Sequence, residues 1–451
     1  MKIVIIGCGT IGSDVLKTLS NDKHIITIID EDKRLVDNLI ERYDIQGVVG
    51  NGASLDVQKE AGVKNADIAI ALTKSDELNV FACLVAKKLG VKNTVARVRN
   101  PEYRHQILTM KDELGISMIV NPEKDTATEI FNLINLPALV EIERFANNRV
   151  TLVEIDVEPG CKLIGENLIS VGQKFETKVL ICAIQRNGNA IIPTGNFEIQ
   201  EGDKVCFTSD TKELRDFLSE INIVKSPLRN VMIVGGSKVA YYLADQLAKK
   251  KHNVKLIESN AEVADELAEV LPKTTIINGN GTQHDLLLEE GIEAMDAFVA
   301  LTDIDEENMI ISMFANKAGV KKTITQIKSD DLYGMLAELG IKNTVSPKDI
   351  VAERVVSYVR AIENSRGSNV LSLYRLVDEQ VEALEFSAKK QEKIYNKPIR
   401  DLKIKKDCLI ACIIRGAQII IPNGNDHIEL GDNVIVVTTH KDFDDLTDII
   451  E

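Results

Sequence analysis

The stretch Lys2-Ile3-Val4-Ile5-Ile6-Gly7-Cys8-Gly9-Thr10-Ile11-Gly12 decides the fold of the amino-terminal part of this chain. It joins a short β-branched run, typical of a buried strand, to the pattern G-x-G-x-x-G and to a predicted helix over 11–20. In such a turn the first glycine permits a tight bend, the second lets a pyrophosphate approach, and the third lets helix and strand pack closely. Phosphates would lie at the helix N-terminus, where free N–H groups and the helix dipole favour negative charge. The stretch therefore predicts a Rossmann-type nucleotide-binding unit.

An acidic residue ends the next predicted strand, which covers 25–29. Asp30 lies about 20 residues beyond the glycines, the spacing expected of a carboxylate that bonds a ribose 2′-hydroxyl. Because a carboxylate repels a 2′-phosphate, Asp30 favours NAD(H) or an adenosine nucleotide over NADP.

The chain consists of two copies of a unit of about 225 residues, the kind of self-similarity that decides an architecture. Landmarks from the start to the end of the first copy recur in one register in the second. The matches are Ile3–Gly7 with Val231–Gly235, Asn51-Gly52 with Asn280-Gly281, Ala71-Leu72-Thr73 with Ala300-Leu301-Thr302, Gly90–Lys92 with Gly319–Lys321, Ile191–Pro193 with Ile420–Pro422, and Gly202-Asp203 with Gly431-Asp432.

Each unit divides again into a larger and a smaller domain. In the first copy, β-branched runs at 3–6, 25–29, 46–49, 68–72, 94–98 and 117–120 alternate with helical segments, which predicts a parallel sheet. The last part of the unit shows short strands and turn signals instead, which is typical of a small α+β module. We therefore predict an α/β protein with two tandem copies of a Rossmann-type parallel-sheet domain followed by a small α+β domain. The expected boundaries are 1–136, 140–220, 229–362 and 370–451.

Composition narrows the function. The net charge is −15 and no basic block occurs, which argues against a nucleic-acid-binding protein. The seven cysteines lie in apolar runs and form no C-x-x-C pair, so we expect buried, reduced thiols; Cys408 and Cys412, four apart on one strand, should face the same way. No metal site is expected, because the six histidines show no ligand spacing. No apolar run reaches the ~18 residues of a membrane span, and we expect a cytoplasmic protein.

Two arginines and a weakened second copy refine the nucleotide prediction. Arg97 and Arg99 lie two apart on the predicted strand Val95–Val98, so both should face one side, at the sheet edge that holds ligands. Guanidinium groups there suit a phosphate or a partner's carboxylate, with a solvated salt bridge as the alternative. The second copy reads Gly235-Gly236-Ser237-Lys238-Val239-Ala240, keeps an acid at Glu258, and has Gln326 and Lys328 in place of the arginines. Its lobe either binds nucleotide weakly or is kept for structure.

These residues resemble the TrkA family, the tandem RCK/Trk-type regulatory subunits of potassium-uptake systems, over essentially the whole chain. The resemblance rests on Lys2–Asp14, Asp30, Gly50–Ala53, Ala71–Asn79, Ala96–Asn100 and the modules 140–218 and 370–448. It implies a cytosolic homotetrameric ring at the inner face of the membrane, attached to an integral K⁺-transporting subunit and binding NAD(H), and ATP or ADP. The implied first site comprises Gly7, Cys8, Gly9, Thr10, Ile11, Gly12, Asp30, Asn51, Thr73, Lys74, Arg97 and Arg99. The implied second site comprises Gly235, Gly236, Ser237, Lys238, Val239 and Glu258.

We therefore expect a regulatory, non-catalytic subunit. The nucleotide bound to it would set the conductance of the attached pore. The main alternative is an NAD-dependent oxidoreductase, since the fold alone does not fix function. An oxidoreductase should supply an acid or base beside the nicotinamide, and the first small module (140–220) carries no histidine. A redox-sensing transcription factor is disfavoured by the acidic balance and by the lack of a helix-turn-helix segment.

Overall fold

The computed structural model describes residues 1–20, 24–100, 103, 106–107, 109–135, 139–145, 150–210, 214–223, 228–336, 339–341, 343–367, 370–377, 380–388, 394–416, 418–441, 443 and 445–451. Contacts divide the chain into two compact units. The first contains Met1–Asn135 and Leu228–Val356, and the second contains Leu136–Pro227 and Ser357–Glu451.

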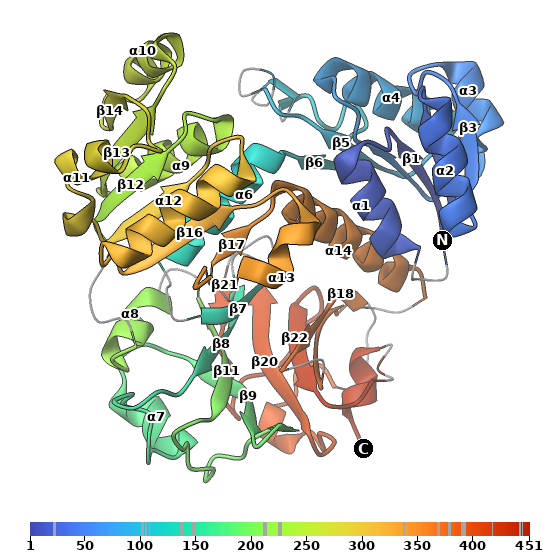
Figure 1. Ribbon diagram of the computed structural model, residues 1–451. Coiled ribbons are helices and arrows are strands. Elements are labelled where there is room, and N and C mark those ends of the chain that lie inside the picture. Colours follow the sequence, from blue (N-terminus) through green and yellow to red (C-terminus); the bar gives the residue numbers. More distant parts are fainter. Residues whose placement is uncertain are drawn as a thin grey trace. The chain divides into compact units, whose positions relative to one another are not determined.

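The first lobe of unit 1 is a six-stranded parallel sheet with the strand order β3-β2-β1-β4-β5-β6 (Figure 1, blue). Its strands are β1 (Lys2–Ile6), β2 (Ile25–Asp30), β3 (Gln46–Val49), β4 (Ile68–Ala71), β5 (Asn93–Arg97) and β6 (Met118–Val120). Its helices are α1 (Thr10–Leu19), α2 (Lys33–Tyr43), α3 (Leu55–Glu60), α4 (Asp76–Leu89) and α6 (Pro122–Asn135). This order reverses direction beside β1, and open parallel sheets bind ligands in the crevice at such a switch point.

The second lobe repeats this sheet, with the order β14-β13-β12-β15-β16-β17. Its strands are β12 (Asn230–Val234), β13 (Asn253–Glu258), β14 (Thr275–Asn278), β15 (Ala297–Ala300), β16 (Lys322–Gln326) and β17 (Thr344–Val345). Its helices are α9 (Lys238–Lys249), α10 (Ala261–Val270), α11 (His284–Glu289), α12 (Asp305–Lys317), α13 (Tyr333–Leu336) and α14 (Pro347–Gly367). The two copies predicted from the sequence thus have matching folds.

Local sequence explains where the helices near the glycine turn (Gly7–Gly12) begin and end. The Asp32 carboxylate accepts hydrogen bonds from the N–H groups at the start of α2, and the Ser75 hydroxyl caps α4 in the same way. Such caps satisfy N–H groups that have no partner within the helix. Helix α4 ends at Gly90, whose φ of +109° is unfavourable for any residue with a side chain. Helix α1 differs, because its N-cap Gly9 offers no side-chain acceptor.

Helix α6 belongs to the first copy by sequence but packs on α9 of the second lobe (Figure 1). Ala127, Ile130 and Ile134 are almost completely buried in a core cluster that also contains the strands and helix α9 of that lobe. Beside this cluster, Asp125 of α6 forms an ion pair with Arg354 of α14. Burial of these apolar side chains, at about 25 cal/mol per Å², stabilises the packing of α6 on the second lobe.

Unit 2 contains two antiparallel five-stranded sheets that share one topology. Their orders are β10-β9-β11-β8-β7 and β18-β19-β22-β20-β21, and residues of both sheets meet in one core cluster. The first has β7 (Leu139–Phe145), β8 (Val150–Asp156), β9 (Leu180–Arg186), β10 (Asn189–Ile191), β11 (Lys204–Asp210), α7 (Leu168–Lys174) and α8 (Leu214–Glu220). The second has β18 (Val370–Leu376), β19 (Val381–Ser387), β20 (Cys408–Arg415), β21 (Gln418–Ile420) and β22 (Asn433–Thr438). Parallel and antiparallel domains therefore alternate along the chain.

The cysteines are all free and buried. One sequence prediction about them is wrong, because Cys408 and Cys412 do not face the same way. Cys412 lies in the core cluster shared by the two sheets, whereas Cys408 lies in a separate cluster of the second module. The pairing of β20 with β22 shifts register between Ile410 and Cys412, and such a bulge changes which face the later residues reach.

Candidate functional site

A cleft of about 750 Å³ opens in the first lobe where the carboxyl ends of its strands meet the glycine turn. Nine of the residues proposed from the sequence line it: Gly7, Gly9, Thr10, Ile11, Asp30, Thr73, Lys74, Arg97 and Arg99. Cys8, Gly12 and Asn51 are not among its lining residues. The sequence reasoning missed other members, which are Ile6, Ile29, Glu31, Asp32, Leu35, Gly50, Gly52, Leu72, Ser75 and Leu78.

The glycines of the turn do different work. Gly7 has φ +87°, and a Cβ atom there would lie 2.7 Å from the backbone nitrogen of Thr73. A Cβ on Gly12 would lie 2.1 Å from the carbonyl oxygen of Gly7, so this position keeps helix and turn close. A Cβ on Gly9 would meet nothing within 4 Å. Gly9 therefore leaves open space at the start of α1, where the helix N–H groups and dipole attract an anion.

Asp30 supports the turn and also faces the cleft. One carboxylate oxygen accepts a hydrogen bond of 2.7 Å from the Cys8 N–H, and the other accepts one of 3.0 Å from the Asp32 N–H. Cys8 contributes its backbone only, because its thiol is buried. Burial, and then the nearby Asp30 charge, raise the pKa of that thiol to about 12. Cys8 is therefore a protonated, unreactive packing residue.

The opposite wall of the cleft is cationic, and Arg97 is its most confined charge. Its Nη1 donates to the carbonyl oxygen of Thr73 at 3.3 Å, whereas its buried Nε has no partner among the residues described. Burial lowers the pKa of Arg97, and the neighbouring positive charge of Arg99 lowers it further. A half-buried cation with an unused, buried donor is stabilised when an anion approaches it. Arg97 thus marks the place where a negative ligand would be most stabilised.

Arg99 lines the cleft, but not because it lies two residues after Arg97 on one strand, as the sequence predicted. Strand β5 ends at Arg97, so the alternation of a strand does not orient both arginines. The backbone N–H groups of Arg99 and Asn100 both donate to one carboxylate oxygen of Asp76, each at 2.8 Å. The Nε of Arg99 donates to Glu123 at 2.6 Å, at the start of α6. This guanidinium is therefore shared between the cleft and the first turn of α6.

Asn79 was not among the residues predicted for the site, yet it organises the cationic wall. Its side chain is fully buried and its amide nitrogen donates to the carbonyl oxygens of Thr73 and Arg97. Its oxygen accepts from both the N–H and the hydroxyl of Thr73. The detectable signal is the repeat itself, since Asn308 makes the corresponding contacts to Thr302 and Gln326 in the second lobe.

The predicted second site is built on the same frame with different side chains. Gly235 has φ +103°, and the Glu258 carboxylate accepts from the Gly236 N–H at 2.5 Å, as Asp30 does from Cys8. Ser237 caps α9 by accepting from the Ala240 N–H at 3.3 Å. The remaining two predicted residues, Lys238 and Val239, open α9.

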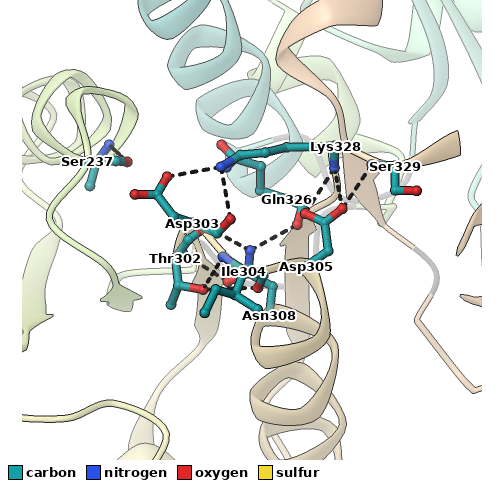
Figure 2. Close-up of polar contacts among 10 residues, drawn as sticks. Ser237, Thr302, Asp303, Ile304, Asp305, Asn308, Gln326, Lys328 and Ser329 are labelled. Atoms are coloured by element: carbon teal, nitrogen blue, oxygen red, sulfur yellow. Dashed lines mark hydrogen bonds and ion pairs between the residues drawn. The ribbon is translucent and has the colours of Figure 1, made fainter.

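Figure 2 shows Ser237 and the polar contacts of the second-lobe wall that corresponds to the cationic wall of the first lobe. The Lys328 side chain reaches Asp303, while the backbone N–H groups of Lys328 and Ser329 donate to Asp305. Within the described residues, no cluster of three or more potential metal ligands occurs. A search of the same residues found no helix with the length and hydropathy needed to cross a bilayer.

Comparison with known proteins identifies the family. The TrkA-N domain pattern matches residues 3–122 and 231–347, and the TrkA-C domain pattern matches residues 152–222 and 384–451. The chain belongs to the TrkA family. It is 31% identical to the Trk system potassium uptake protein TrkA homolog 1 of Methanosarcina mazei, over 97% of each chain. It is also 31% identical to the Trk system potassium uptake protein TrkA of Vibrio alginolyticus, over 98% of this chain and 97% of that one.

Solved structures agree with this TrkA assignment at the level of fold. The GsuK channel matches with a TM-score of 0.64 and 17% identity, over 97% of this chain and 76% of that one. A GsuK channel bound to NAD matches with a TM-score of 0.63 and 17% identity, with the same coverage. A GsuK structure bound to ADP matches with a TM-score of 0.50 and 13% identity, over 81% and 69%. As a TrkA-family protein the chain is a regulatory protein and not an enzyme.

Proposed function

We propose that this TrkA-family chain is the cytosolic regulatory subunit of a Trk-type K⁺ uptake system. It binds NAD(H), ATP or ADP in the first-lobe cleft, and the bound nucleotide sets the conductance of an integral-membrane K⁺ transporter subunit. The subunit lies at the inner face of the cell membrane through that partner. The names of its full-length relatives, which are potassium uptake proteins, support this role.

The observation that carries the proposal is the state of Arg97. Its buried Nε lacks a partner within the described residues, and burial and the charge of Arg99 lower its pKa although Glu123 and Asp76 act in the opposite direction, so the cleft presents a guanidinium with an unused donor. The N-terminus of α1 opens on the same cleft at Gly9. A phosphate lying between them would accept hydrogen bonds from both, and hydrogen bonds to charged groups are worth about 1.5–3 kcal/mol each. The arrangement therefore suits the phosphates of a nucleotide.

The far end of the cleft suits an unphosphorylated ribose. Asp30, Glu31 and Asp32 all line it. Three neighbouring carboxylates repel a 2′-phosphate more strongly than Asp30 alone. This favours NAD(H) or an adenosine nucleotide over NADP.

A structural path for regulation runs from Arg99 to the second lobe. Arg99 is held by Glu123 in the first turn of α6, and α6 is buried against α9. A phosphate that competes for Arg99 would loosen this end of α6. Only a ligand that binds two arrangements with different affinity can shift their populations, and the shared guanidinium supplies such a difference.

Exposed apolar side chains support the proposed homotetrameric ring. Phe81 on α4 and Ile310 on α12 occupy equivalent positions of the two copies and are 53% and 56% exposed. We propose that these two equivalent side chains lie in contacts between subunits. Repeated lobes of one chain can therefore use the same contact around a ring.

The test is K⁺ flux into vesicles that contain the Trk membrane subunit, with this chain added together with NADH, NAD, ATP or ADP. We expect flux to change with nucleotide when the wild-type chain is present. The same measurement with Arg97→Gln, which introduces the residue of the second lobe, should lose the nucleotide dependence. Flux that ignores all four nucleotides would overturn the proposal.

A further inference from the structure

The two lobes differ most where the first-lobe cleft carries its positive charge. The cationic side chains of that cleft are Lys74, Arg97 and Arg99. Their counterparts in the register of the repeat are Asp303, Gln326 and Lys328. Three cations are thus replaced by one carboxylate, one neutral amide and one ammonium group, so these three positions together carry no net charge.

Of these three counterparts only Lys328 is a cation, and it is already paired. The Lys328 ammonium donates to the Asp303 carboxylate at 2.9 Å and to the carbonyl oxygen of the same residue at 3.1 Å (Figure 2). The backbone N–H of Lys328 is held by Asp305 at 2.9 Å. Because the Asp303 side chain is 95% exposed, it places a carboxylate at the surface where the first lobe presents Lys74. An approaching phosphate meets this negative charge before it can reach Lys328.

The glycine turn of the second lobe is also less open. A Cβ atom at Gly9 would point into free space, and Ser237 fills the corresponding position. The Ser237 hydroxyl accepts from the Ala240 N–H, which removes one of the donors that a helix N-terminus offers to an anion. The second lobe therefore has less positive charge on this wall and one free N–H fewer at the turn, while Lys238 at the start of α9 is the cation that it gains in place of Thr10.

We propose that Asp303, together with Gln326, sets the charge selectivity of the second lobe and excludes nucleotide phosphates from it. The chain then binds a diphosphate or triphosphate in the first lobe only, one per chain. This inference rests on the proposed function of the first-lobe cleft. The second lobe then binds no nucleotide itself. It responds to the nucleotide in the first lobe through helix α6.

The expected difference in affinity is large. Replacing Lys74 and Arg97 removes two charge-assisted contacts, and each contributes about tenfold in affinity or more. We therefore expect ADP to bind the second lobe about 100-fold or more weakly than the first. The exposed Lys328–Asp303 pair is itself weak, so the altered charge of the wall matters more than the strength of this pair.

Isothermal titration calorimetry of the full chain with ADP tests the inference through the number of sites. The wild type should bind one ADP per chain. Lys74→Asp/Arg97→Gln, which gives the first lobe the residues of the second, should bind none. Asp303→Lys/Gln326→Arg, the reverse exchange, should bind two.

Control variants separate specific effects from changes in net charge or folding. Asp265→Lys/Glu266→Gln, on the exposed surface of α10, changes the net charge by as much as Asp303→Lys/Gln326→Arg does. This control variant should still bind one ADP per chain. Because Gln326 is only 4% exposed, Asp303→Lys alone is the second test should the double variant fail to melt cooperatively. The single variant should raise the affinity of the second lobe at least tenfold, since it removes one negative charge and adds a positive one.

The possible results distinguish the inference from the proposed function. Two ADP sites in the wild type, or one retained by Lys74→Asp/Arg97→Gln, would overturn the inference and leave nucleotide binding intact. A folded Asp303→Lys variant without any gain in second-lobe affinity would overturn the role of Asp303. No binding of any nucleotide to the wild type would instead overturn the proposed function.

Discussion

The Nε atom of Arg99 lies 2.6 Å from a carboxylate oxygen of Glu123, and this pair joins the first-lobe cleft to helix α6, which packs on the second lobe. The Glu123 side chain is only 12% exposed, and its other carboxylate oxygen is buried without a partner among the described residues. A phosphate in the cleft and Glu123 therefore compete for one guanidinium. Several consequences can be measured.

Glu123→Gln should tighten nucleotide binding. The substitution keeps the shape of the side chain but removes the charge that competes for Arg99, so we expect ADP affinity to rise about threefold to tenfold. Calorimetric titration measures the change. Asp56→Asn, on the exposed start of α3, is the control of equal charge and should leave the affinity unchanged. Unchanged or weaker binding by Glu123→Gln would contradict the competition.

Arg97→Gln should separate binding from stability. Losing the charge that faces the phosphate should weaken ADP binding about tenfold or more. The melting temperature without nucleotide should change little, because the half-buried guanidinium has one donor without a partner among the described residues and makes one hydrogen bond, of 3.3 Å, to Thr73. Arg97→Ala should also remove any difference between the responses to ATP and ADP. A persistent difference would show that another group reads the terminal phosphate.

Stability should fall in strongly alkaline solution. Burial raises the pKa of the Cys8 and Cys83 thiols from about 9 to about 12, so the folded chain keeps protons that the unfolded chain releases. The free energy of unfolding should therefore be unaffected by these thiols below pH ~9 and decrease between pH ~9 and ~12, by up to about 1.4 kcal/mol per pH unit for each. Urea unfolding at a series of pH values measures the slope. Cys8→Ser/Cys83→Ser, if folded, should reduce the slope without abolishing it, because burial also raises the pKa of the Cys161, Cys182 and Cys408 thiols.

Ile130→Ala should weaken the attachment of α6 to the second lobe. Ile130 is completely buried in the shared core, and such a truncation costs about 2–4 kcal/mol. Chemical denaturation gives the loss, and Ile25→Ala, at an isoleucine that is 58% exposed, provides the matched control. Equal effects of the two substitutions would mean that α6 is not held by this core.

Much of the fold could be predicted because periodicity and glycine spacing are local properties. The run before Gly7, the acid at Asp30 and the repeated Ala-Leu-Thr motif indicated two Rossmann lobes. Strand ends were less accurate, since the segment expected over 94–98 is Asn93–Arg97. The docking of α6 on the other lobe was not predictable, because an amphipathic pattern identifies an apolar face without saying what covers it.

The site was predicted where a residue type has one obvious use, and missed where long-range contacts decide. Arg97 and Thr73 followed from their motifs, and both line the cleft. The pairing of Arg99 with Glu123 joins a loop to a helix, and no sequence spacing fixes that contact. Asn79 was missed because the sequence marks it only by its repetition at Asn308, although its four hydrogen bonds hold the wall of the cleft.

Titration of the full chain with NADH tests the central claim most directly, using Asp30→Ala and its second-lobe counterpart Glu258→Ala. Both carboxylates support a glycine turn in the same way, so the two variants carry equivalent structural damage. We predict that the wild type and Glu258→Ala bind NADH equally well at one site per chain and that Asp30→Ala binds none. Binding that survives Asp30→Ala, or that is lost with Glu258→Ala, would contradict the assignment of the first-lobe cleft as the nucleotide sensor.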